Sequence, residues 1–240
     1  MSKDPIVVTT SWDDGYNADF KVFKLMKKYD LKGTFYVCIN RKNFNRLSNS
    51  EIKQISKTQE IGAHTLTHPA LTKISLNEVK QEALGSKREL EKILGKKVLS
   101  FAYPYGRYNQ LVEEVVKKSG FVMARADKPF HFSNRDPFAI NVSCDAYQHR
   151  FLGNCLLLTQ SGQEGLKFLF TEGFANDWVK LAKKTFDFVL RFGGVWHLHG
   201  HSYEIERSNL WENLEEVFSY VSHRDVQYCF NKDLVKFVST

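Results

Sequence analysis

The chain has few cysteines and prolines and no long apolar run. Its four cysteines (Cys38, Cys144, Cys155 and Cys229) stand far apart, without a Cys-x-x-Cys pair, which excludes a disulfide framework and a zinc knuckle. No apolar segment approaches the ~20 residues of a membrane span. The first residues lack the apolar stretch and cleavage site of a signal peptide. We therefore expect a soluble cytoplasmic protein with reduced thiols and no membrane span.

Blocks of five or more like charges are also missing, although Lys and Arg (34) outnumber Asp and Glu (27) by seven. The excess lies in residues 1–120, which carry 21 basic and 13 acidic residues. A net charge of this size suits nucleic acid, an anionic membrane or an acidic glycan and does not select among them. Lysine pairs such as Lys27-Lys28 and Lys96-Lys97 stand near the ends of predicted helices, where they complement the helix dipole. This placement favours solvated helix ends over a binding stripe, and without a recognised motif we expect no nucleic-acid partner.

Strand-like and helical patterns alternate along the chain. Such alternation predicts an α/β protein with a parallel sheet and helical crossovers. No linker or internal repeat interrupts it, so we expect a single domain over residues 1–240. The predicted strands are residues 6–12, 34–39, 61–64, 98–103, 121–126, 140–144, 166–170, 195–199 and 226–229. The predicted helices are residues 17–29, 48–58, 76–94, 108–119, 177–192 and 210–221, followed by a last short helix.

The first strand ends in Asp13-Asp14-Gly15. Adjacent carboxylates raise each other's pKa unless a cation or a proton neutralises one of them. A bound metal would do this, with one Asp as a ligand and the other as a base. The alternative is an Asp-Asp-Gly turn with Asn17 as a helix cap, since Asp and Gly are turn residues.

The third strand ends in His64-Thr65-Leu66-Thr67-His68. Two histidines four residues apart present two imidazole nitrogens to one metal on a tight loop, although this spacing alone is common by chance. Together with one carboxylate they make a facial triad with open coordination positions. An open metal site acidifies water and polarises a carbonyl, which is what amide or ester hydrolysis needs.

Two later strand ends complete the set. Tyr103-Pro104-Tyr105-Gly106 forms either a loop whose N–H groups hold an oxyanion or an ordinary strand-to-helix turn. Strand alternation places His197, His199 and His201 on one face, provided that the strand extends that far. One of these histidines is a candidate general acid for a leaving amine, and at least one is expected to be structural.

In this order, the four motifs resemble the polysaccharide deacetylase family, also called the NodB-homology domain or carbohydrate esterase family four. The resemblance covers residues 10 to about 204, most of the chain. It implies a distorted (β/α) barrel of about seven strands and metal-dependent removal of acetyl groups from N-acetylated sugars. It also implies Asp14, His64 and His68 as metal ligands, with zinc as the metal and cobalt, nickel or manganese as alternatives.

The resemblance assigns further roles. Asp13 would be the catalytic base, Thr65 would steady the histidine loop, and the Tyr105 N–H, beside Pro104, would hold the oxyanion. Among the late histidines we expect His201 to be the general acid and His197 the second choice, with His199 lining the acetyl pocket.

Two departures from the family pattern stand out. The family often has an arginine where this chain has Ala102, and Arg125, at the end of the next predicted strand, is the candidate substitute. For the family's Asp-Trp element, Asp145 is the nearest candidate.

Three functions follow from these residues. The first is a deacetylase of an N-acetylated sugar, in cell-surface polysaccharide biosynthesis. The second keeps the metal but hydrolyses a non-sugar C–N bond in a cyclic amide or imide, in a small closed pocket. The third is a degenerate glycan-binding domain, for which the 14% of aromatic residues argues. The expected partner is thus an N-acetylated carbohydrate or a small amide, and the sequence indicates no oligomeric state.

Overall fold

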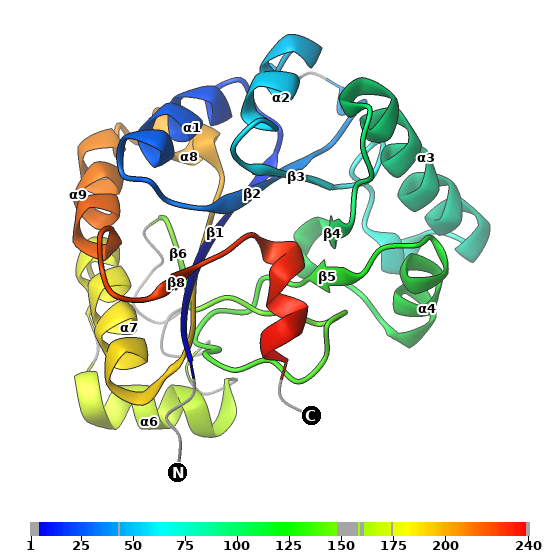
Figure 1. Ribbon diagram of the computed structural model, residues 1–240. Coiled ribbons are helices and arrows are strands. Elements are labelled where there is room, and N and C mark those ends of the chain that lie inside the picture. Colours follow the sequence, from blue (N-terminus) through cyan, green and yellow to red (C-terminus); the bar gives the residue numbers. More distant parts are fainter. Residues whose placement is uncertain (1–4, 43, 148–157, 159–160, 174, 239–240) are drawn as a thin grey trace.

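The sheet is organised around β1 (Ile6–Asp14), which is buried along almost its whole length. The strand order is β5-β4-β3-β2-β1-β7-β6, and β8 also pairs with β1. All of the paired strands run parallel. This confirms the predicted parallel sheet with helical crossovers, and the helices lie around its outside (Figure 1).

The computed structural model describes residues 5–42, 44–147, 158, 161–173 and 175–238. Its strands after β1 are β2 (Gly33–Val37), β3 (Glu60–Ala63), β4 (Ser100–Ala102), β5 (Met123–Arg125), β6 (Cys144–Asp145), β7 (Gly194–Gly200) and β8 (Gln227–Tyr228). Its α-helices are α1 (Asp19–Lys28), α2 (Asn49–Ile55), α3 (Leu76–Leu94), α4 (Gln110–Lys118), α6 (Gly162–Glu172), α7 (Trp178–Phe192), α8 (Ser202–Arg207) and α9 (Trp211–Val221). Short 3₁₀ turns are η1 (Leu71–Lys73), η2 (Pro104–Gly106) and η3 (Asn231–Phe237).

The two outer strands of the sheet, β5 and β6, are connected by the segment that precedes β6. Arg125 of β5 forms an isolated parallel bridge with Ile140. Further along the same segment, Cys144 pairs with Leu198 of β7. Residues 140–145 therefore join both edges of the sheet, which gives the expected distorted barrel of about seven strands.

Local sequence signals fix several helix ends. Ser48 and Ser75 begin α2 and α3 with complete capping boxes, in which Glu51 and Glu78 return the hydrogen bond to the cap. Gly95 ends α3 with a left-handed φ of 68°, as its sequence position predicts. These caps determine where α2 and α3 begin and where α3 ends before the chain enters β4.

The predicted strand at residues 166–170 was wrong, because this segment lies inside α6. A short apolar run fits a buried strand or a helix equally well. In α6 only Phe168 of the run is fully buried, while Leu166 and Phe170 are 45% and 85% exposed.

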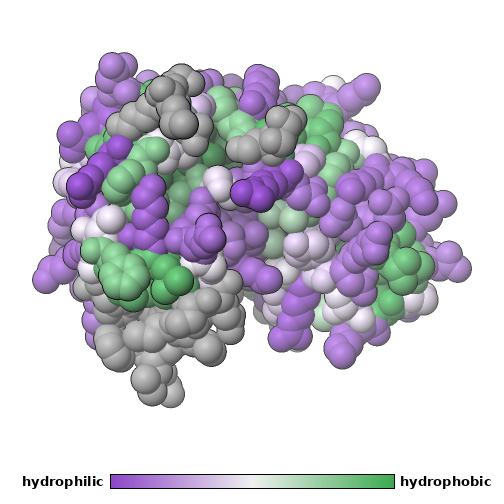
Figure 2. Space-filling view, turned by 90° about the horizontal axis from the view of Figure 1, so that it is seen from below, coloured by the Kyte–Doolittle hydropathy of each residue, from purple (hydrophilic) through white to green (hydrophobic). Residues whose placement is uncertain are grey.

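The surface seen in Figure 2 is mostly hydrophilic with apolar patches between the polar side chains.

Smaller differences concern element ends. The strand predicted at residues 140–144 is reduced to β6 and the Ile140 bridge. β7 ends at Gly200, and α8, which was not predicted, begins at Ser202. Cys38, Cys144 and Cys229 are free thiols, and Cys155 lies outside the described residues. No helix among the described residues is both long and apolar enough to cross a membrane.

Candidate active site

The residues predicted to form a site gather at one end of the barrel. Because the strands run parallel, their C-terminal ends meet there. β1 ends in Asp13 and Asp14, β5 in Arg125 and β6 in Asp145, while His64 directly follows β3. Pro104 and Tyr105 follow β4, His197 and His199 lie in β7, and His201 comes directly after β7.

Asp14, His64 and His68 form the first cluster. Asp14 Oδ1 lies 3.2 Å from His68 Nε2 and 3.6 Å from His64 Nε2, and the two Nε2 atoms are 3.0 Å apart. All three side chains are buried. Ligand atoms 2.0–2.1 Å from a tetrahedral ion lie roughly 3.3 Å from one another. The spacing in the cluster therefore fits one shared metal ion.

Two other side chains hold the histidine loop in place. The Thr65 hydroxyl accepts a hydrogen bond from the His68 N–H at 3.0 Å and donates to the His64 carbonyl. Glu82 of α3 accepts from two backbone N–H groups of the loop, at 2.7 and 2.9 Å. Glu82 carries no signal in the sequence, because its loop contacts depend on how α3 packs.

The protonation states of the cluster suit metal binding. His64 Nδ1 lies 2.9 Å from the Ala102 carbonyl, which only accepts, so Nδ1 carries the proton and the Nε2 lone pair faces the cluster. Burial lowers the pKa of His64 and takes that of His68 to about 4, so both imidazoles are neutral near pH 7. Asp14 Oδ1 has no hydrogen-bond partner among the described residues. The three donors fit a divalent ion with mixed nitrogen and oxygen ligands.

Asp13 stands beside this cluster and is held by Arg125. The Arg125 guanidinium, which is fully buried, donates from Nη2 to Asp13 Oδ2 and from Nη1 to the Ala126 carbonyl. Burial alone raises the pKa of Asp13, but Arg125 and the neighbouring histidines bring it well below its usual value. Oδ1 of Asp13 has no hydrogen-bond partner among the described residues. Asp13 is thus an ionised carboxylate with one free oxygen.

His199 faces Asp13 from the other side. Its Nδ1 lies 2.7 Å from Asp145 Oδ1, and its Nε2 lies 3.4 Å from Asp13 Oδ2. Burial and Arg125 lower the pKa of His199, yet the nearby carboxylates of Asp13 and Asp145 outweigh them and raise it to about 9. An imidazolium is a proton donor and cannot ligate a metal. The cluster of Asp13, His199 and His201, although compact, therefore fits acid–base chemistry better than metal binding.

The other two histidines of this segment lie differently. His197 is fully buried, its Nε2 lies 2.8 Å from Ser11 Oγ, and burial holds its pKa well below the usual value. His201 is partly exposed at the rim, with Nε2 4.0 Å from Asp14 Oδ2 and Nδ1 3.5 Å from Glu204 Oε2. His197 thus contacts the core, and His201 contacts the edge of the metal cluster.

Tyr105 forms part of the rim. It is 55% exposed, and its ring centroid lies 4.7 Å from that of His68. Its φ of 59° is left-handed, as are those of Asp14, Thr65 and His68. Each such residue costs about 1–2 kcal/mol. Half of the eight non-glycine residues with left-handed φ in the described part of the chain thus lie at this site, where strain commonly gathers.

Arg41 is a site residue that belongs to none of the sequence motifs. Its Nη1 forms an ion pair with Asp14 Oδ2, and its guanidinium lies 4.5 Å from the Phe44 ring centroid. Phe44 in turn contacts Tyr16 and Tyr203, with ring centroids 5.0 and 6.0 Å away. Arg41 lies four residues beyond β2, and this position after a strand end is the one hint in the sequence, since the ion pair itself depends on how the loop folds back.

Comparison with known proteins finds a family match for the first half of the chain. The family model described as polysaccharide deacetylase matches residues 1–124. The chain is 27% identical over 113 residues to the peptidoglycan-N-acetylmuramic acid deacetylase PdaC of Bacillus subtilis, covering 46% of this chain and 24% of the relative. It is 27% identical over 108 residues to a peptidoglycan-N-acetylglucosamine deacetylase of Bacillus cereus, covering 43% and 38%. The chain therefore matches well under half the length of these relatives.

Solved structures show the fold over nearly the whole chain. A protein from Mycobacterium smegmatis, described as a polysaccharide deacetylase, aligns over 99% of this chain and 91% of its own, with a TM-score of 0.72 and 15% identity. A pseudoenzyme of the CE4 family from Bacillus anthracis aligns over 99% and 67%, with a TM-score of 0.61 and 16% identity. At these identities the likeness concerns the fold alone.

Proposed function

The chain belongs to the polysaccharide deacetylase family, and we propose that it is a metal-dependent hydrolase that removes the acetyl group from an N-acetylated sugar. The observation that supports this most is that three potential ligands of one metal ion lie next to an ionised carboxylate and a protonated histidine. Asp14, His64 and His68 would hold the metal, for which we propose zinc, with cobalt, nickel or manganese as alternatives. When bound, the ion supplies Lewis acidity toward the acetyl carbonyl and toward water.

In this proposal Asp13 takes the proton of the attacking water at its free Oδ1 atom. The Arg125 guanidinium occupies Oδ2, so it keeps the carboxylate ionised and turns one oxygen toward the site. Arg125 would then orient Asp13, which is the role of the family's arginine at the position occupied here by Ala102. Ala102 of β4 and Arg125 of β5 are paired in the register of the two strands. An arginine on β5 thus stands beside the position where the family has one on β4.

We propose His199, rather than the His201 expected from the sequence, as the general acid. Its pKa of about 9 keeps it protonated near pH 7, and Asp145 fixes its orientation through Nδ1. Nε2 then donates its proton to the nitrogen of the departing amine as the C–N bond breaks, and acetate leaves with the water oxygen. The Tyr105 N–H remains the proposed donor to the oxyanion, beside Pro104.

This arrangement also favours an enzyme over a glycan-binding domain with a degenerate site. One structural neighbour is a pseudoenzyme, so the fold itself does not require activity. Here Asp13 and the three proposed ligands are present together, and His199 has its carboxylate partner. Such buried charges have a desolvation cost that an inactive site has no reason to retain.

Acetate release from N-acetylated oligosaccharides tests the proposal. We expect metal-free protein to be inactive and added zinc to restore activity, and we expect Asp13→Asn to lose at least about a hundredfold in kcat. Asp225→Asn, an exposed position away from the site, is the control. Full activity without metal, or in Asp13→Asn that melts like the parent, would contradict the mechanism. Turnover of a cyclic imide but of no acetylated sugar would contradict the substrate class.

A further inference from the structure

Three hollows follow one another along the outside of the barrel. The largest, of about 650 Å³, lies at the N-terminal ends of β2, β3 and β4, opposite the candidate active site. A second, of about 410 Å³, shares Lys27, Lys57 and Thr58 with it. A third, of about 350 Å³, shares Lys53 with the second and reaches Asn40 and residues beyond β2. The hollows form a continuous path around α2.

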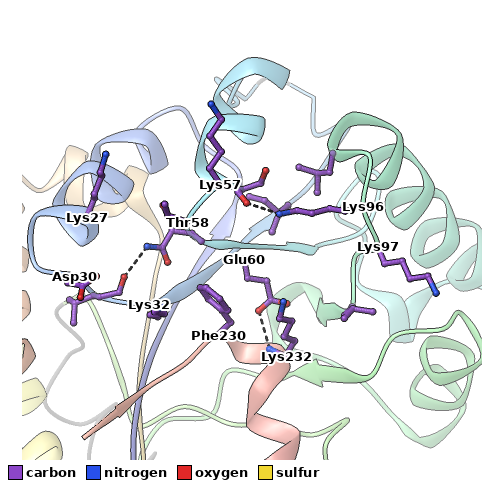
Figure 3. A pocket seen from close by; sticks show the side chains of 16 residues that line it. Lys27, Asp30, Lys32, Lys57, Thr58, Glu60, Lys96, Lys97, Phe230 and Lys232 are labelled. Atoms are coloured by element: carbon purple, nitrogen blue, oxygen red, sulfur yellow. Dashed lines mark hydrogen bonds between the residues drawn. The ribbon is translucent and has the colours of Figure 1, made fainter. Parts of the chain in front are cut away.

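Lysines line this path. Figure 3 shows the large hollow, where the lysines come from α1, from the segments before β2, β3 and β4, and from η3. They are Lys27, Lys32, Lys57, Lys96, Lys97 and Lys232. Lys53, Lys92 and Arg46 continue the row through the other two hollows. We call these nine cations the lysine track.

The positive charge of the track exceeds what the helix ends require. The three hollows are also lined by three carboxylates, Asp30, Glu60 and Glu89, so the nine cations leave an excess of six positive charges. The C-terminal ends of α1, α2 and α3 lie here, and each adds about half a negative charge. More than four positive charges remain. Glu60 is moreover buried and accepts hydrogen bonds from Thr34 and Ser100 at 2.6 and 2.7 Å.

Few of these cations are engaged within the protein. Lys96 donates to the Ser56 carbonyl at 2.7 Å, and Arg46 donates to the Ile39 carbonyl. The other side chains of the track form no ion pair or side-chain hydrogen bond within the described part of the chain. Most of them are exposed. Their charge is therefore available to an anionic ligand.

The track leads toward the rim of the active site. Arg46 forms a bridge with Tyr16, whose ring contacts Tyr203. Asn40, in the third hollow, precedes Arg41, which is paired with Asp14 of the metal cluster. A chain-like ligand on the track therefore arrives beside the catalytic residues.

We propose that the lysine track binds the anionic backbone of a polymeric glycan whose repeating units carry carboxylate or phosphate groups. This inference rests on the proposed function, since it names the class of N-acetylated carbohydrate that reaches the site. Counterions released from the polymer drive binding to such a row of cations, so the affinity falls with salt. Nucleic acid fits less well, because single strands need free aromatic faces for stacking. The ring of Phe230 already carries the ammonium groups of Lys32 and Lys232, 5.3 and 5.4 Å from its centroid.

Binding of labelled polymers to the full chain tests the proposal. The probes are oligogalacturonate, which carries carboxylates, polyphosphate, neutral dextran and single-stranded DNA. The track variant carries Lys53→Gln, Lys57→Gln and Lys97→Gln. The control carries Lys118→Gln, Lys128→Gln and Lys180→Gln, which makes the same change in net charge on exposed positions elsewhere.

We expect oligogalacturonate, polyphosphate or both to bind more tightly than dextran, and the tighter one identifies the anion. The track variant should bind it about tenfold more weakly at low salt, as three exposed ion pairs allow, and the control within about twofold. Equal weakening in both variants, tighter lysine-dependent binding of DNA, or no binding of either polyanion would overturn the proposal.

Activity separates this inference from the proposed function. On a short neutral N-acetylated oligosaccharide, both triple variants should keep the parent kcat/KM. On an anionic N-acetylated polymer, only the track variant should show a raised KM. Lysine-dependent glycan binding without acetate release from any substrate would contradict the proposed function but would still support glycan binding by the lysine track. Acetate release without any effect of the track variant on the polymer would contradict the track alone.

Discussion

Replacing Arg125 by alanine should both destabilise the protein and shift its pH profile. Arg125 is fully buried and is paired with Asp13, whose side chain is 6% exposed. Removing one partner of a buried ion pair leaves an uncompensated charge and costs about 3–5 kcal/mol. For a chain of this size each kcal/mol lowers the melting temperature by about 2–4 °C. We therefore expect Arg125→Ala to melt roughly 6–20 °C below the parent protein.

The pH dependence follows from the pKa of Asp13. Burial raises this pKa, and Arg125 is the strongest of the groups that lower it. A carboxylate with a lowered folded-state pKa adds stability above its unfolded value of 3.8, and this stability is lost as the pH falls through the folded pKa. Without Arg125, burial dominates and the pKa rises. The acid limb of kcat/KM should then move up by at least about one pH unit, which corresponds to 1.4 kcal/mol.

Thermal melts and pH–rate profiles measure the two effects. Arg125→Lys keeps the charge and is expected to fold with a smaller pH shift, so it reports on the pair even where the alanine variant unfolds. Arg135→Ala, at an exposed position, is the control. In a double-mutant cycle, Asp13→Asn should recover part of the stability lost in Arg125→Ala, since it removes the stranded charge. An unchanged melting temperature together with an unchanged acid limb would refute the role of Arg125.

Three further predictions concern the same site. Removing the metal with a chelator should lower the melting temperature as well as abolish activity, because a ligand that binds only the folded state stabilises it; equal melts with and without zinc would contradict the metal cluster. His199→Gln should reduce kcat by about 10²–10⁴-fold and remove a basic limb near pH 9, whereas His201→Gln should keep that limb; the reverse pattern would make His201 the acid. The raised pKa of His199 also adds stability below pH 6.5 that is lost as the pH rises through about 9. Arg41→Ala should change the zinc affinity by about tenfold or more, measured by competition with a chelating dye, since Arg41 holds the second oxygen of Asp14; an unchanged affinity would show that Arg41 does not position that ligand.

The sequence allowed a parallel sheet to be predicted, with Asp14 and His64 at strand ends and His68 close behind, because these features depend on local signals. Asp13 and Asp14 end a strongly β-branched run, and the two histidines recur at a short spacing. A parallel sheet brings such strand ends together whatever the details of the crossovers. Periodicity and the geometry of strands thus predicted where these side chains lie, whereas the choice of Asp14 as the ligand and Asp13 as the base came from the resemblance to the family.

The assignment among the late histidines depended on contacts that the sequence does not display. His199 and Asp145 are 54 residues apart, and they meet because β6 pairs with β7. His201 looked favourable beside a flexible glycine, but β7 ends at Gly200 and leaves it at the rim. The same reason explains why Arg41 was missed: its partner is 27 positions earlier, and their ion pair depends on how the loop after β2 folds back.

The central place of β1 has a consequence for synthesis of the protein. Its partner β7 begins at Gly194, so the edge of β1 that pairs with β7 stays unpaired while roughly 70 residues after β5 are being made. At about 5–20 residues per second this synthesis takes roughly 4–14 s. An open, apolar edge is a template for pairing with other chains. During this interval the strand that carries both aspartates offers such an open edge to other chains. A shortened chain that ends after β5 would keep all three proposed metal ligands and that open edge permanently.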